Sequence, residues 1–127
     1  MNRKVWPEKM EVCFFNMDTG YQCLRFEGGK ISSDLLENPV EPSLSDWGKF
    51  WDNLDEIGFW DWKEDYEQCC LVDGYEWNAN IAYNGREMQS AGLNDGPTQV
   101  VGDGMVSTLE HFLDALEDLC GVRLGNR

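Results

Sequence analysis

The sequence predicts an α+β fold, in which an antiparallel β-sheet of about five to six strands carries two amphipathic helices on one face. Apolar and polar residues alternate over much of residues 10–33 and 59–91, with the period of two that marks half-buried strands. Apolar residues recur at intervals of three and four over residues 44–57 and 108–120, which is the spacing of a helix face. With 127 residues, 42% of them hydrophobic, the chain 1–127 has the size and the apolar content of a single domain.

The first third of the chain is expected to be a β-meander over residues 10–33. A β-rich apolar stretch at residues 10–16 is followed by turn residues, and a second alternating stretch covers residues 21–27. Gly28-Gly29 then marks another turn, which leads to a short third strand.

A helix is predicted over residues 44–57. Ser43 or Ser45 can cap its first turn, and Gly58 can end it. One face of this helix is apolar and rich in aromatic residues: Leu44, Trp47, Phe50, Trp51, Leu54 and Ile57. Such a stripe is typical of a helix that packs on a protein core, so we expect it to be buried.

A β-hairpin is predicted over residues 75–91. Asn84-Gly85 in its middle is the strongest short-range signal for a two-residue turn, because both turn positions need a positive φ. With this turn, Trp77 lies opposite Gly92, where it meets a residue without a side chain.

The elements around this hairpin have weaker signals. Trp60 and Trp62 alternate with polar residues, which predicts a further strand at residues 59–66. Residues 92–106 are rich in glycine and are expected to form a long mobile loop. The last helix, over residues 108–120, is predicted to begin at a capping box made by its N-cap serine and a glutamate three residues later.

Four short motifs follow one another in the second half of the chain: Trp47-x-x-Phe50-Trp51-x-x-Leu54, Trp60-x-Trp62-x-x-x-Tyr66, Asp73-Gly-x-x-Trp77 and Gly92-x-Asn94-x-x-Pro97. In this order and spacing, they resemble a widespread family of small bacterial proteins to which no reaction is assigned. The similarity covers roughly residues 47–121. Family members usually carry Ala-Tyr where Asp95-Gly96 stands here, and residues 98–106 look like an added loop. The resemblance implies a fold type and carries no activity.

Charge is the most unusual feature of the composition. The chain has 24 acidic and 10 basic residues, a net charge of −14, and residues 46–76 contain ten acidic residues against two lysines. Such a surface repels nucleic acids and anionic membranes, which are themselves negative, and attracts a basic protein. The alternative is that the acidity only keeps the protein in solution.

The five cysteines are expected to be reduced thiols that behave as small apolar side chains. No apolar stretch follows the basic N-terminal residues, so we expect no signal peptide and a cytoplasmic protein. The vicinal pair Cys69-Cys70 could be a redox switch, but neighbouring cysteines form a strained disulfide, which favours two free thiols. No apolar run approaches the ~20 residues that a membrane-spanning helix needs.

No catalytic residue, metal site or cofactor is expected. His111 is the only histidine, and its place opposite the leucine stripe of the last helix predicts an exposed side chain. No serine or cysteine can be given the base that nucleophilic catalysis requires. Asp95-Gly96 and Asp103-Gly104 lack the acidic residue four positions earlier that an EF-hand calcium loop needs.

Two functions remain open. The first is a small non-enzymatic protein that neutralises a basic partner, a nucleic-acid-binding protein or a toxin, as anti-CRISPR and immunity proteins do, with acidic residues in the place of phosphate groups. The partner-binding residues are then expected to be Asp52, Glu56, Asp61, Glu64, Asp65 and Glu67. The second is a small ligand-binding or enzymatic domain that uses residues 92–104 as a lid. A bound basic protein would favour the first function, and a bound metabolite would favour the second.

Overall fold

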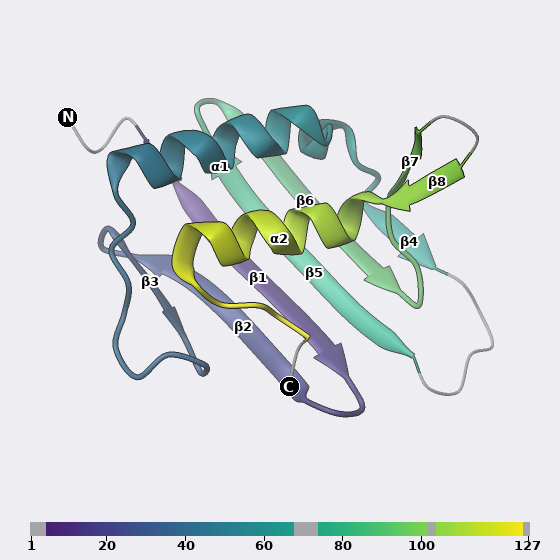
Figure 1. The fold of residues 1–127 in the computed structure, drawn as a ribbon, viewed down its shortest axis with the longest axis horizontal. Helices are drawn as coiled ribbons and strands as arrows, with labels where there is room; N and C mark the ends of the chain where they lie inside the picture. The colour runs from purple at the N-terminus through teal and green to yellow at the C-terminus, as the bar shows by residue number, and fades with distance from the viewer. Residues whose placement is uncertain (1–4, 68–73, 102–103, 126–127) are drawn as a thin grey trace.

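The computed structural model describes residues 5–67, 74–101 and 104–125 of the chain (Figure 1). In chain order its elements are β1 (Lys9–Asn16), β2 (Gly20–Glu27), β3 (Lys30–Ser33), α1 (Leu44–Glu56), the 3₁₀ helix η2 (Phe59–Asp61), β4 (Asp65–Glu67), β5 (Tyr75–Tyr83), β6 (Arg86–Leu93), β7 (Thr98–Val101), β8 (Gly104–Ser107) and α2 (Thr108–Cys120). The main sheet has six strands in the order β3-β2-β1-β5-β6-β4, and α1 and α2 lie side by side across one of its faces. All neighbouring strands are antiparallel except β4 and β6. The predicted α+β fold is therefore confirmed, with one parallel pair at an edge.

The predicted meander and hairpin are both present. β1 pairs with β2, and β2 pairs with β3. In the hairpin, Asn84 and Gly85 have φ angles of 52° and 81°, as a two-residue turn of this kind requires, and Trp77 faces Gly92. β6 continues to Leu93, beyond its predicted end. β1 also pairs with β5, so the N-terminal strand lies in the middle of the sheet (Figure 1).

The strand predicted over residues 59–66 is wrong for most of its length, because η2 occupies its start and only β4 pairs with the sheet. Phe59 and Trp62 lie three residues apart and both enter the core, whereas Trp60 is partly exposed. Gly58 has a left-handed φ of 69°, which turns the chain from the end of α1 directly into η2. The alternation of the two tryptophans therefore reflects a helical turn.

The two predicted helices are confirmed, together with the serines that begin them. The Ser43 hydroxyl accepts a hydrogen bond from the Asp46 amide at 3.0 Å, and the Asp46 carboxylate accepts one from the Ser43 amide at 3.2 Å. At α2 only half of the predicted capping box forms: the Ser107 hydroxyl accepts from the Glu110 amide at 3.2 Å, but the Glu110 carboxylate pairs with Arg123. Gly121, with a φ of 82°, ends α2. The two serines satisfy amides that a helix leaves without partners at its start.

The apolar faces of the helices and the inner face of the sheet form one core. Trp47 and Phe50 of α1 and Phe112 and Leu116 of α2 are at most 1% exposed. The predicted burial of the aromatic stripe is confirmed for Trp47, Phe50, Trp51 and Leu54, whereas Leu44 is 51% exposed and Ile57 is only partly buried. In the described part of the chain, no helix has the length and apolar character needed to cross a membrane.

Residues 92–106 do not form the single long loop that the sequence predicts. Gly92 and Leu93 belong to β6, and β7 pairs with β8 in a separate two-stranded sheet beside the start of α2 (Figure 1). The amide of Thr108 donates to the carbonyl of Pro97 at 3.1 Å, which ties the base of this hairpin to α2. The prediction of a loop is therefore wrong for the parts of this range that β6, β7 and β8 occupy.

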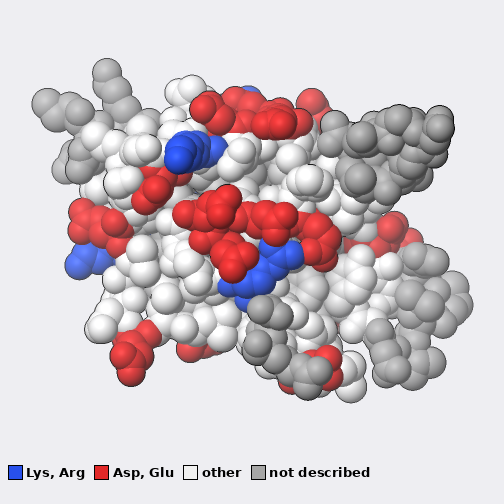
Figure 2. Space-filling view, in the orientation of Figure 1, with Lys and Arg blue, Asp and Glu red and all other residues white. Residues whose placement is uncertain are grey.

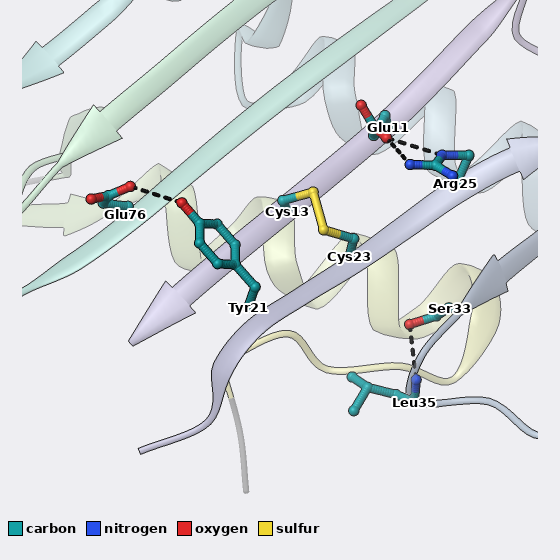
Figure 3. The surroundings of a disulfide bond; sticks show 8 residues. All are labelled: Glu11, Cys13, Tyr21, Cys23, Arg25, Ser33, Leu35 and Glu76. Carbon is teal, nitrogen blue, oxygen red and sulfur yellow. Dashed lines mark hydrogen bonds and ion pairs between the residues drawn. A yellow bond between two sulfur atoms is a disulfide. The ribbon is translucent and has the colours of Figure 1, made fainter. Parts of the chain in front are cut away.

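The cysteines differ from the prediction of five free thiols. Cys13 and Cys23 face each other across β1 and β2, with Cα atoms 4.1 Å apart, and form a disulfide on the side of the sheet away from the helices (Figure 3). Cys120 is free, and burial raises the pKa of its thiol. Cys69-Cys70 lies outside the described residues. The prediction is wrong for Cys13 and Cys23, so reduced thiols no longer support the cytoplasmic location.

Candidate partner-binding surface

All six residues predicted to bind a partner have exposed side chains. They come from consecutive elements: Asp52 and Glu56 from α1, Asp61 from η2, Glu64 from the turn before β4, and Asp65 and Glu67 from β4. On α1 the exposure follows from the amphipathic pattern, because Asp52 and Glu56 lie one helical turn apart on the face opposite the buried Trp47.

The structure divides these six residues into two groups. Glu56 and Asp61 line one hollow of about 570 Å³, between the end of α1 and the start of α2. Glu64 and Asp65 line another of about 430 Å³, and Asp65 and Glu67 line a third of about 610 Å³, both beside β4 and β6. We call the first set the helix group (Asp52, Glu56 and Asp61) and the second set the edge group (Glu64, Asp65 and Glu67).

A row of acidic residues on α2 was missed by the prediction. Glu110, Asp114, Glu117 and Asp118 recur at intervals of three and four and are all exposed. This spacing, opposite the leucine stripe, is the signal in the sequence that could have found them. Since α1 and α2 lie side by side, their acidic faces are neighbours on one side of the molecule (Figure 2). We call the exposed acidic residues of the two helices the acidic helix layer: Asp52, Asp55, Glu56, Glu110, Asp114, Glu117 and Asp118.

Both helices carry acidic residues at the C-terminal end, where the helix dipole disfavours negative charge. Asp55 and Glu56 lie in the last turn of α1, Glu117 and Asp118 lie in the last turn of α2, and neither helix has a basic residue there. A negative charge at a helix C-terminus meets the negative end of the helix dipole, which is unfavourable by about 0.3–1 kcal/mol at low ionic strength. The arrangement therefore lowers the stability of both helix ends.

Arg123, just after α2, offsets part of this charge. Its guanidinium lies 2.5 Å from the Glu110 carboxylate, pairs with Asp114, and lies 4.0 Å from Glu117. The Arg123 side chain is 22% exposed, so these pairs are partly shielded from water. One guanidinium thus holds three carboxylates of α2, while Asp118 has no such ion pair in the described part of the chain.

The negative charge also affects two tyrosines. Burial raises the pKa of Tyr75, and the charges of Asp95 and Glu110 raise it further. On the opposite face of the sheet, the Tyr21 hydroxyl donates to the Glu76 carboxylate at 3.2 Å, and this hydrogen bond raises the pKa of Tyr21 (Figure 3). Both hydroxyls are therefore neutral at physiological pH.

The 570 Å³ hollow is acidic, with Lys63 as the one basic residue of its lining among the described residues. Its lining includes the carboxylates of Asp55, Glu56, Asp61 and Asp95 and contains no histidine or cysteine. Across residues 5–67, 74–101 and 104–125, no cluster of three or more His, Cys, Asp or Glu side chains is arranged to hold a metal ion. His111 is exposed on α2, as the sequence predicts.

The motif residues around the hairpin have structural roles. The Trp77 indole nitrogen donates to the Asp95 carbonyl at 2.9 Å, and the Asn94 side-chain oxygen accepts from the Tyr75 amide at 2.9 Å. A Cβ at Gly74 would overlap that Asn94 side chain, so a larger residue there would displace Asn94 and break its hydrogen bond to the Tyr75 amide. These contacts close the end of the hairpin, and none of them indicates a reaction.

Comparisons with known proteins add no assignment. A scan against protein-family models, a search of curated proteins and a search of solved structures find no match to this chain. The resemblance to a family of small bacterial proteins therefore stays a prediction from its motifs.

Proposed function

We propose that this protein binds a basic partner, a nucleic-acid-binding protein or a toxin, through the acidic helix layer and occupies the partner's phosphate-binding site. It would act as a non-enzymatic inhibitor of the anti-CRISPR or immunity type, in the cytoplasm, where such partners act. The observation that carries the proposal is the side-by-side packing of two helices whose exposed faces are both acidic (Figure 2).

The scaffold suits such a role because the helices are held rigidly. Proteins contact nucleic-acid backbones mainly through Lys and Arg side chains, which carboxylates can engage in place of phosphates. The buried faces of α1 and α2, with Trp47 and Phe112 fully buried, fix the acidic rows on the core. A partner therefore meets carboxylates whose backbone positions do not have to be ordered on binding.

Solubility alone explains this arrangement less well. A soluble protein can carry its acidic residues anywhere on the surface, and the first turns of helices are favourable places for them. Here Asp55, Glu56, Glu117 and Asp118 stand in last turns, at some loss of helix stability. Carboxylates placed where they destabilise a helix support a binding role.

A second function, a small ligand-binding or enzymatic domain, is favoured by the 570 Å³ hollow. Asp95, Pro97 and Thr98, from the range expected as a lid, line it together with Glu56 and Asp61. A metabolite that copurifies with the native protein, detected by native mass spectrometry, would support this function over the first.

The test of the first function combines capture with competition. The immobilised protein is exposed to a host-cell extract, and a basic protein retained in stoichiometric amount is purified. Its binding to a fluorescent nucleic acid is then titrated with the wild-type protein. We expect the protein to displace the nucleic acid, and we expect Glu117→Gln together with Asp118→Asn to weaken this displacement.

The matched control changes exposed acidic residues away from the helices, with Glu27→Gln, Asp34→Asn and Glu37→Gln. This control should displace nucleic acid as the wild type does. Simultaneous binding of the protein and the nucleic acid to the partner would contradict the proposal.

A further inference from the structure

One stretch of the main sheet has a free edge. β6 has eight residues, whereas β4 has three and pairs only with the end of β6, from Ala91 to Leu93. Among the backbone hydrogen bonds of the described residues, none joins Glu87 or Gln89 to a neighbour on this side. The first half of β6 therefore has a strand partner, β5, on one side only.

The backbone groups of Glu87 and Gln89 point outward. The Ala91 amide points away from β5, because it donates to the Glu64 carbonyl at 2.9 Å on the β4 side. In an antiparallel strand, alternate residues direct their N–H and C=O groups to the same side. Gln89 and Glu87 have the parity of Ala91, so they present unpaired donors and acceptors at the edge.

Two hollows flank this edge. One of about 400 Å³, between η2 and the start of β6, is lined by Asp55, Asp61, Arg86 and Glu87. The hollow of about 430 Å³ extends over β5 and β6 and is lined by Asn80, Gln89, Glu64 and Asp65, among others. The side chains of Glu87 and Gln89 are exposed. The described chain therefore leaves space beside the free part of β6, next to η2. Four acidic residues besides Asp55 line that space, together with Arg86, whose charge is paired with Asp55.

We propose that the free edge of β6, at Glu87 and Gln89, accepts an extended basic segment of the partner as an added strand. Strand addition of this kind takes its affinity from backbone hydrogen bonds, and the flanking side chains set the sequence preference. The carboxylates of Asp61, Glu64, Asp65 and Glu87 favour lysine or arginine at alternate positions of that segment. The inference rests on the proposed function, and it gives Glu64 and Asp65 of the edge group a role separate from that of the acidic helix layer.

The first experiment is amide hydrogen exchange followed by NMR on the full chain, with a peptide of alternating lysine and valine as the probe at low salt. Without the peptide, the outward amides of Glu87 and Gln89 exchange freely, and the Met88 amide, which faces β5, is protected. With the peptide, Glu87 and Gln89 become protected and Met88 does not change. No binding of this peptide, or binding without protection of the two amides, would overturn the proposal.

The second experiment removes backbone hydrogen-bond donors at the edge, first from the protein and then from the peptide. Gln89→Pro deletes an outward amide and leaves the β5–β6 ladder intact, since proline is tolerated on edge strands. The peptide counterpart carries N-methyl groups on alternate residues and keeps its charge. At a net ~0.5–1.5 kcal/mol for each hydrogen bond, Gln89→Pro should weaken binding by about two- to tenfold, and the N-methylated peptide, which loses several hydrogen bonds, should bind more weakly still. Gln89→Ala is the matched control and should bind as the wild type does.

The outcomes separate this inference from the proposed function. If Gln89→Pro folds and binds the peptide as tightly as wild type, or if the N-methylated peptide binds equally well, the edge is not the docking site. If charge reversal of the acidic helix layer leaves binding to the captured partner unchanged, the proposed function fails, whatever the peptide does.

Discussion

Trp77 lies directly across the hairpin from Gly92, and its indole nitrogen occupies the space where a side chain at position 92 would begin. A Cβ at Gly92 would lie 2.1 Å from that nitrogen and 2.3 Å from the Asp95 carbonyl oxygen, which accepts the indole hydrogen bond. Trp77 is 3% exposed and contacts Trp62 in the core. The close approach of strand and indole therefore depends on glycine.

Gly92→Ala should destabilise the protein by about 1–3 kcal/mol, because the added methyl group displaces a buried indole and breaks its hydrogen bond. Gly48→Ala is the matched control. Gly48 lies within α1, and the space that a Cβ would occupy there is open, so alanine should stabilise the helix by ~0.5–1 kcal/mol. Urea unfolding of both variants measures the difference, and equal stabilities would contradict the packing described for Trp77.

Residue-resolved alkylation should separate the cysteine environments of the described chain. Cys120 is 6% exposed with a raised thiol pKa, so it should resist iodoacetamide in the native protein and react after denaturation. Cys13 and Cys23 should react only after both denaturation and reduction. Peptide mass spectrometry reads each site, and labelling of Cys13 without a reductant would contradict the disulfide.

The raised pKa of Cys120 also predicts a dependence of stability on pH. The folded state holds the thiol proton more tightly than the unfolded state does, so the associated stability is complete below the ordinary thiol pKa of about 8.5. It is lost as the pH rises from there through the raised value. Cys120→Ala should remove this part of the alkaline decline in the free energy of unfolding, which urea titrations at a series of pH values measure. An unchanged alkaline decline in this variant would contradict the contribution of the thiol.

Arg123→Gln tests whether charge on α2 guides a partner. The substitution frees Glu110, Asp114 and Glu117 from their shared cation, so the acidic helix layer becomes more negative. We expect faster association with a captured basic partner at low salt, and we expect the gain to vanish at high salt. The Arg25→Gln control breaks the Glu11 pair on the opposite face and should leave the rate unchanged. A slower rate for the Arg123 variant would contradict a steering role for α2.

Elements with strong local signals could be predicted from the sequence. Asn84-Gly85 defines a turn by itself, and Ser43 and Ser107 mark helix starts through bonds within a few residues. The disulfide was also within reach, because Asn16 pairs with Gly20, and counting outward from that pair sets Cys13 opposite Cys23. The odd number of cysteines and the expectation of a reducing, cytoplasmic location pointed away from it.

Features set by tertiary contacts could not be predicted. β4 has three residues and no alternating pattern. Its parallel pairing with β6 depends on the position of η2, which precedes it in the chain and sets where β4 begins. The acidic faces of the two helices are each visible in the sequence. Their assembly into one surface depends on α1 packing beside α2, which no local pattern specifies. The division of the six predicted residues into a helix group and an edge group has the same origin.

The most direct test of the acidic surface as a docking site is the association rate of a captured basic partner over a series of salt concentrations. The wild type is compared with a variant in which Asp52, Glu56, Glu117 and Asp118 of the acidic helix layer are all replaced by lysine, and circular dichroism serves as the folding control. Exposed charges contribute only ~0–1 kcal/mol each to stability, so the variant should fold. We predict that the wild-type rate falls steeply as the Debye length shrinks to about 10 Å at 0.1 M salt and that the variant does not bind. A variant that folds and binds at the wild-type rate would show that these carboxylates do not form the docking surface.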